Sequence, residues 1–140
     1  MDAEDFIDGI HAFVYHGAID GTLKNLTRPA GRRPREDLAN LSAWFNQLTP
    51  EDARQVAAVV RLAAGQSIFD MMAVLDGIQF IDDEHTVLNL DAGSGIRLNE
   101  RHDLHELFQI RVDHELGYVD EFGRPLDSGD RAPGRRPDGS

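Results

Sequence analysis

Cysteine is absent from this 140-residue sequence, and lysine occurs once, as Lys24, among 14 basic residues. Without a thiol the chain can form no disulfide, no thiolate metal site and no iron–sulfur cluster, and it has no cysteine nucleophile. The scarcity of lysine resembles a bias of genomic base composition, so we give it no functional weight.

Long apolar runs are also missing. The strictly apolar stretches, such as residues 57–60, are far shorter than the roughly 20 residues that a membrane-spanning helix needs. The first residues, MDAEDFIDGI, carry acids in place of the basic and apolar segments of a secretory signal. We therefore expect a cytoplasmic protein without a membrane span.

The charge is strongly unbalanced, with 25 acidic residues against 14 basic ones and a formal net charge of −11. This charge repels nucleic-acid phosphates and anionic lipids, and it favours a basic protein as the partner. The length suits one domain with one core. We expect a single globular domain over residues 1–126 and a disordered tail over 127–140, because the tail, DSGDRAPGRRPDGS, has no large apolar residue.

Helical periodicity predicts a first helix that begins behind a capping Asp2 and runs to about His16, before Gly17. Its apolar residues have the spacing of one buried face: Phe6, Ile7, Ile10, Phe13 and Val14. Residues 18–35 contain glycines, prolines and four arginines and are expected to form a loop. We interpret His11 and His16 as surface and cap residues of the first helix.

Two further helices are predicted before residue 78. One runs from near Pro34 to Leu48, with Leu38, Leu41, Phe45 and Leu48 as its apolar stripe. The other runs from Thr49 to Gly77, because Thr49 can cap a helix and Pro50 suits its first turn. These helices, with the first, account for most of the expected core.

The spacing of the apolar residues is no longer helical after Gly77. Short β-compatible runs at 78–81, 86–90 and 96–98 are separated by turn-rich segments, which predicts a small antiparallel sheet or meander. The glycine-rich residues 91–95 are interpreted as a hairpin turn. A last helix is expected from about Glu100, behind a capping Asn99, to Leu116. The fold class is therefore α+β and mainly helical.

Histidines and acids crowd residues 100–115, where His102, His105 and Glu106 have the spacing of ligands on one helical face. The apolar residues expected to be buried lie opposite to His102 and Glu106 on a helical wheel, so a solvated polar face is the favoured interpretation. The segment also lacks the His-Glu-x-x-His pattern. We assign no metal site, no cofactor and no catalytic residue, and His105 is kept as the metal candidate.

Asp82, Asp83 and Glu84 form an acidic turn beside His85, and we name these three acids as candidate binding residues. Closely spaced carboxylates can bind a cation or raise one another's pKa. The alternative is a solvated turn, because Asp hydrogen-bonds to the backbone of turns.

Trp44 stands beside the apolar stripe of the second predicted helix and is the remaining binding candidate. It either widens the buried face or anchors another protein from a half-exposed position. Burial is the favoured interpretation, because exposed tryptophan is uncommon.

A set of residues expected in the core and at helix caps carries a resemblance to a protein family. They are Trp44, Phe45, Leu48, Thr49, Glu51, Asp52, Val56, Val59, Val60, Arg61, Ser67, Ile68, Phe69, Leu75, Asp76, Gly77, Leu98, Asn99, Leu104, His105, Leu107 and Phe108. With them the sequence resembles a family of small bacterial proteins known only as a domain of unknown function, over about residues 5–108. The resemblance implies an α+β domain in bacteria and implies no activity.

Two functional hypotheses follow from these features. The first is a non-enzymatic protein-binding module of the immunity or inhibitor kind, whose acidic surface covers a basic partner. The alternative is a metal-assisted hydrolase or a small-ligand-binding protein that uses His105 together with the acids of the turn at 82–84. The second requires the last helix to bring its histidine to the sheet.

Overall fold

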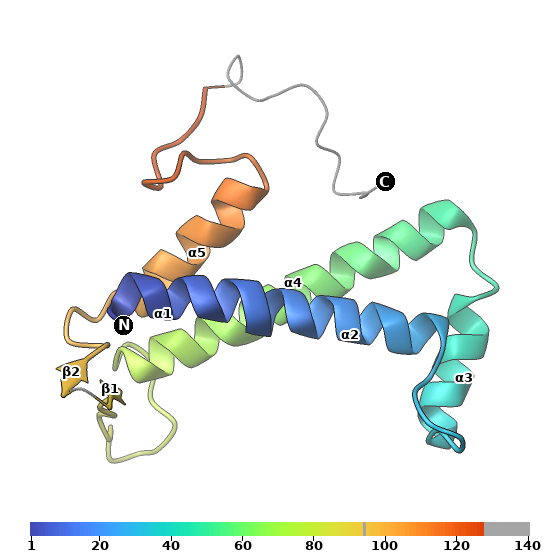
Figure 1. Ribbon diagram of the computed structural model, residues 1–140, viewed down its shortest axis with the longest axis horizontal. Coiled ribbons are helices and arrows are strands. Elements are labelled where there is room, and N and C mark those ends of the chain that lie inside the picture. Colours follow the sequence, from blue (N-terminus) through green and yellow to red (C-terminus); the bar gives the residue numbers. More distant parts are fainter. Residues whose placement is uncertain (94, 128–140) are drawn as a thin grey trace.

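The computed structural model describes residues 1–93 and 95–127 (Figure 1). The described chain is mainly helical with a small two-stranded antiparallel sheet, as predicted. The prediction of a disordered tail falls, apart from Asp127, outside the described residues. α3 (Glu36–Phe45) and the sheet lie at opposite ends of the molecule, and one long helical run extends between the two ends (Figure 1).

This helical run consists of α1 (Ala3–Gly9), the π-helix η1 (Ile10–Tyr15) and α2 (His16–Thr27). It begins, as predicted, at Asp2, whose side chain accepts a hydrogen bond from the backbone N–H of Asp5 in a reciprocal capping box. The predicted end near His16 and the predicted loop from residue 18 are wrong. Ile19 and Leu26 are buried and Leu23 packs against the core, so the apolar spacing carries the helix through Gly17 and Gly21.

The π-helix changes which side chains of the run are buried. In η1 the backbone N–H bonds five residues back, which adds one residue to the turn and moves the later residues by about 100° relative to an α-helix. Ile7 is buried as predicted, and Tyr15 shares its core, whereas Phe13 is 83% exposed and Val14 is also exposed. The predicted burial of Phe13 and Val14 is therefore wrong, because their face turns outward after Ile10.

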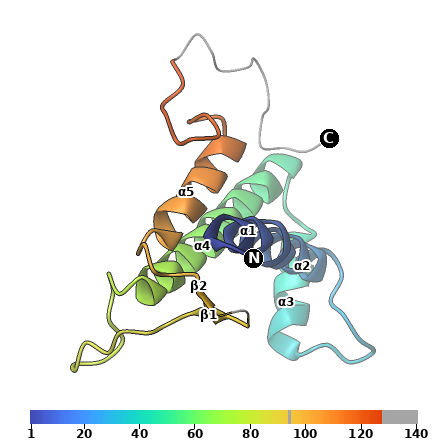
Figure 2. The same ribbon diagram turned by 60° about the vertical axis from the view of Figure 1, so that its left-hand side comes forward.

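Two helices follow the loop after α2. α3 (Glu36–Phe45) packs on α2, and α4 (Pro50–Leu75) runs unbroken for 26 residues. The predicted cap of α4 is confirmed, since the Thr49 hydroxyl accepts a hydrogen bond from the N–H of Asp52 and Pro50 occupies the first turn. The helical run α1–η1–α2 crosses α4 in both views (Figures 1 and 2).

The sheet is smaller than predicted. β1 (Asp91–Ala92) pairs with β2 (Ile96–Arg97) in the expected glycine-rich hairpin. Residues 78–81 and 86–90 form no strand, although the N–H of Leu98 donates to the carbonyl of Leu90 beside the hairpin. Ile78, Ile81 and Val87 are exposed, so these segments have no apolar face to bury against the helices.

The last helix, α5 (Leu104–Glu115), begins later than predicted, and Asn99 does not cap it. Asn99 is buried instead, where its amide group donates to the carbonyls of Leu75 and Leu88 and its Oδ1 accepts from the N–H of Leu90. One side chain thus ties the end of α4 to the segment before the hairpin. Gly117, with a φ of 78°, follows α5 as expected for a helix stop.

One hydrophobic cluster joins the helical run, α4 and α5. Its buried members are Ile7, Tyr15, Ile19, Met72, Leu104, Phe108 and Val112. The apolar spacing of the last helix predicts burial of Leu104, Leu107, Phe108 and Val112; Leu104, Phe108 and Val112 are buried, and Leu107 is partly buried against the core. This core packs α5 against α4, α1 and η1.

Candidate functional site

Trp44 lies on α3 with 50% of its surface exposed, so the favoured interpretation of a core tryptophan is wrong. Leu41, one turn earlier on the same face, is 51% exposed, although it was expected in the buried stripe. The face of α3 that packs against α2 is more polar than expected. It includes Ser42, which is buried, and Asn46, whose amide donates to the carbonyl of Thr27.

α4 is apolar but little covered. An 18-residue window of this helix has a mean hydropathy of 1.4, and 17% of the window is buried. By length and composition α4 could therefore cross a membrane, although a single helix of this kind is weak support for a span. Val59 and Leu62, one turn apart, are 63% and 73% exposed.

The acidic turn forms a local hydrogen-bonded structure. Asp82, Asp83 and Glu84 are all exposed, and Asp82 accepts hydrogen bonds from the N–H and the hydroxyl of Thr86. The hydroxyl bond and then the N–H bond from Thr86 lower the pKa of Asp82 below its ordinary value. These contacts are those expected of a solvated turn.

His105 is placed next to Asp76 and not next to the acidic turn. Its Nδ1 lies 2.6 Å from Asp76 Oδ2, and its backbone N–H donates to the same oxygen at 2.9 Å. Because a carboxylate only accepts, Nδ1 of His105 carries the hydrogen of this bond. The Asp76 side chain is fully buried, so the pair joins α4 to α5 inside the protein.

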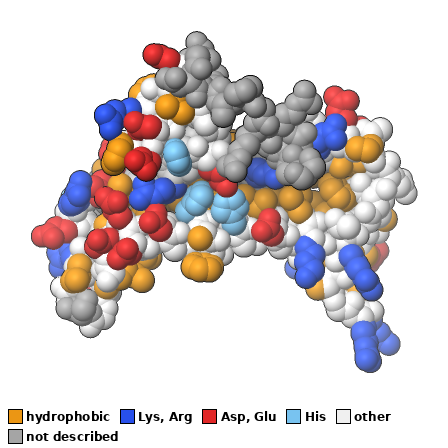
Figure 3. Space-filling view, turned by 45° about the horizontal axis from the view of Figure 1, so that its top comes forward, with side chains coloured by type: hydrophobic (Ala, Val, Ile, Leu, Met, Phe, Trp, Pro, Cys, Tyr) orange, Lys and Arg blue, Asp and Glu red, His pale blue; other side chains and the backbone are white. Residues whose placement is uncertain are grey.

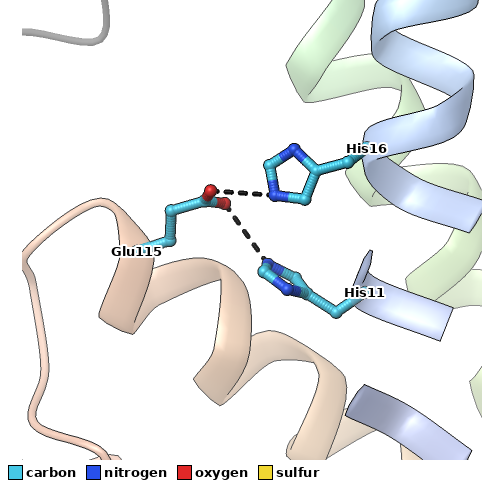
Figure 4. Close-up of side chains that lie close together, drawn as sticks. All are labelled: His11, His16 and Glu115. Carbon is cyan, nitrogen blue, oxygen red and sulfur yellow. Dashed lines mark hydrogen bonds and ion pairs between the residues drawn. The ribbon is translucent and has the colours of Figure 1, made fainter. Parts of the chain in front are cut away.

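A histidine cluster that the sequence analysis assigned to surface and cap roles lies between the helical run and α5 (Figure 4). Glu115, the last residue of α5, accepts a hydrogen bond from Nε2 of His11 at 3.3 Å, and its other carboxylate oxygen lies 2.8 Å from Nε2 of His16. Each of the three residues offers one atom that could bind a metal ion, a ring nitrogen or a carboxylate oxygen, and these atoms lie within 4.8 Å of one another. Over residues 1–93 and 95–127, this is the one group of three or more such side chains placed to share a metal ion.

The surroundings of the cluster are partly apolar. The ring of Tyr15 stacks on His11 with 5.4 Å between centroids and meets His16 edge-on at 5.0 Å. Burial lowers the pKa of His11, against the opposing effect of Glu115. Burial, and then the charge of Glu115, raise the pKa of Tyr15.

Sequence spacing could not have shown this cluster. His16 follows His11 by five positions, which in an α-helix places their side chains about 140° apart. The π-helix between them removes this offset, since the N–H of His16 bonds to the carbonyl of His11. Glu115 joins them only through the packing of α5 against η1.

No family model, no curated protein and no solved structure matches the chain. The resemblance to a family of small bacterial proteins therefore stays a prediction.

Proposed function

We propose that the protein is a non-enzymatic protein-binding module that binds its partner through the exposed apolar side of α4. The observation that carries this proposal is the low burial of an apolar helix, 17% over its most hydrophobic window. Contiguous apolar surface on a soluble chain is usually covered by a partner. Val59 and Leu62 are the large exposed side chains that share one face there.

The distribution of large hydrophobic side chains supports the same proposal. Among the described residues, 16 large hydrophobics are exposed, whereas the buried hydrophobic core has 10 members. Each Å² of apolar surface removed from water contributes about 25 cal/mol, so covering several of these side chains would stabilise a complex substantially. Trp44 and Leu41 on α3 offer a second anchor, and tryptophan is enriched among residues that dominate binding energy.

The charge of the chain favours a basic partner. A net charge of −11 attracts positively charged proteins at long range and raises their association rate. On the face in Figure 3, most acidic side chains gather toward the end that carries the sheet, and arginines project at the end of α3. Proteins of the immunity or inhibitor class act by covering the surface of a partner, and we propose this class for the chain because its acidic surface would complement a basic one.

The test is affinity capture with the tagged full chain, in which Leu62→Asp is compared with Ile81→Asp. The two side chains have similar exposure, 73% and 71%, but Ile81 lies in the loop after α4. We expect the wild type and Ile81→Asp to capture the same basic protein, and Leu62→Asp to lose it. Sedimentation velocity of the purified chain would show whether a second copy covers the helix instead.

Two results would overturn this proposal. One is a partner that Leu62→Asp retains as well as the wild type does. The other is binding of the purified chain to phosphatidylcholine vesicles that Leu62→Asp abolishes, which would make α4 a lipid-binding helix. The hydrolase alternative has less support, because it pairs His105 with the acids of the turn at 82–84. In the structure Nδ1 of His105 lies 2.6 Å from Oδ2 of Asp76 instead.

A further inference from the structure

Two imidazoles and one carboxylate converge at the junction of η1, α2 and α5. His11 and His16 direct their Nε2 atoms at the two oxygens of Glu115 (Figure 4). Their side chains are 20%, 36% and 40% exposed in the order His11, His16, Glu115. The group is therefore open enough for an ion to enter, and its inner side is closed by Tyr15.

The backbone is shaped in a way that aligns the two histidines. The rings of His11 and His16 meet at 4.9 Å between centroids, across the turn whose hydrogen bond spans five residues. π-helical turns are rare and occur frequently at functional sites. Here the turn also places Tyr15 in the core, so the apolar packing holds the backbone conformation that aligns the ligands.

The local field favours a cation. Glu115 is the last residue of α5, where the negative end of the helix dipole disfavours a carboxylate and stabilises positive charge. Arg111, one turn earlier, is the nearby opposing charge, but its guanidinium is paired with Asp8 at 2.6 Å and with Glu4 at 3.6 Å. The pairing of Arg111 with these two acids reduces its repulsion of a metal ion bound to Glu115.

We propose that His11, His16 and Glu115 form a binding site for a divalent transition-metal ion, with Zn²⁺ as the ion that suits these donors best. Two histidines and a glutamate are a known ligand set of zinc sites that keep a fourth position for water. Ligand atoms about 2.1 Å from a tetrahedral ion lie about 3.4 Å from one another. Nε2 of His16 and Nε2 of His11 lie 2.8 Å and 3.3 Å from different oxygens of Glu115, and one ligand atom from each of the three residues lies within 4.8 Å of the others, so the three side chains already converge on one position.

Metal binding requires a change of tautomer in the imidazole that is hydrogen-bonded to Glu115. A carboxylate only accepts hydrogen bonds, so Nε2 of His11 carries the hydrogen of its bond to Glu115 in the ion-free protein. On binding, each histidine presents a bare Nε2 to the ion and holds its hydrogen on Nδ1, so the neutral imidazole of His11 gives up its Nε2 hydrogen to water, takes one at Nδ1 and releases no net proton. The ion then takes the place of the Nε2 hydrogen, and Glu115 changes from a hydrogen-bond acceptor to a metal ligand.

The test is calorimetric titration of the EDTA-treated, dialysed full chain with ZnCl₂, followed by a Co²⁺ titration monitored by visible absorption. We expect one Zn²⁺ per chain, a raised melting temperature and the intense absorption of tetrahedral Co²⁺. His16→Gln and Glu115→Gln should each weaken Zn²⁺ binding at least tenfold. His85→Gln, which removes an exposed histidine elsewhere, should bind as the wild type does.

The proposal is overturned if the wild type shows no saturable Zn²⁺ binding. It is equally overturned if His16→Gln and Glu115→Gln bind as tightly as His85→Gln, since the ion would then sit elsewhere. Circular dichroism of each variant checks that the helices are intact. These variants leave α4 unchanged, so the result is independent of the partner-binding test with Leu62→Asp.

Discussion

Asp76 at the end of α4 caps the first turn of α5 from another helix: its Oδ2 accepts the backbone N–H of His105 at 2.9 Å and the Nδ1–H of the same residue at 2.6 Å. The residue before α5, Asp103, makes no side-chain capping bond to it. His102 completes the joint by donating its Nδ1–H to the carbonyl of Asp76 at 2.6 Å. A buried acid thus satisfies donors at the start of one helix while it ends another.

Asp76→Ala should lower the free energy of unfolding by about 3 kcal/mol, because it leaves the N–H and the imidazole of His105 without their buried acceptor. Urea unfolding followed by circular dichroism would measure the change. Asp83→Ala is the control, since Asp83 is exposed, and it should change stability by less than about 0.5 kcal/mol. Equal effects of the two substitutions would show that the joint between α4 and α5 contributes little.

The sequence predicted the parts of the fold that depend on local chemistry. Asp2 and Thr49 cap helices, and Gly117 ends one, because the capping oxygen or the positive φ acts within a few residues. α2 was missed because Gly17 and Gly21 were interpreted as helix breakers. The buried stripe of α2, in which Ile19 and Leu26 take part, outweighs the low helix propensity of glycine.

The candidate sites were harder to predict, for two physical reasons. A π-helix changes the period of a helix by one residue, so a search for α-helical spacing places His11 and His16 on different faces. Contacts between distant segments, such as Glu115 with His16 or Asp76 with His105, depend on how the helices pack. The sequence did single out Trp44, and its exposure could be settled only by the packing of α3.

Trp44→Ala should lower the free energy of unfolding by about 1 kcal/mol or less, because half of the side chain is already in water. Phe108→Ala, which empties a fully buried position, should cost about 3–5 kcal/mol. Acrylamide should quench the native fluorescence strongly, since Trp44 is the single tryptophan. Weak quenching together with a large loss of stability would contradict the exposed position of Trp44.

The pKa of Asp82 should lie below its ordinary value, because the Thr86 hydroxyl and N–H both donate to the ionised carboxylate. The stability that this interaction contributes is fully present above the pKa of the unfolded state, and it is lost as the pH falls through the lower pKa of the folded state. Carboxyl chemical shifts in an NMR pH titration would measure it. Thr86→Val should move the pKa of Asp82 upward, because it removes the hydroxyl donor. An unchanged Asp82 titration in Thr86→Val would show that the turn is not formed in solution.

Gly65 lies where the ring of Tyr15 packs over α4, and substitutions there test the crossing of the two helices. A β-carbon at position 65 would be 3.6 Å from Tyr15 Cε2, an ordinary van der Waals contact. Gly65→Ala should therefore raise the free energy of unfolding by about 0.5–1 kcal/mol, through better helix propensity without a clash. Gly65→Leu should lower it by about 1–3 kcal/mol, because the larger side chain forces Tyr15 away from α4. Thermal and urea unfolding of both variants would measure these changes, and a Leu variant as stable as the Ala variant would mean that η1 does not cross α4 at this point.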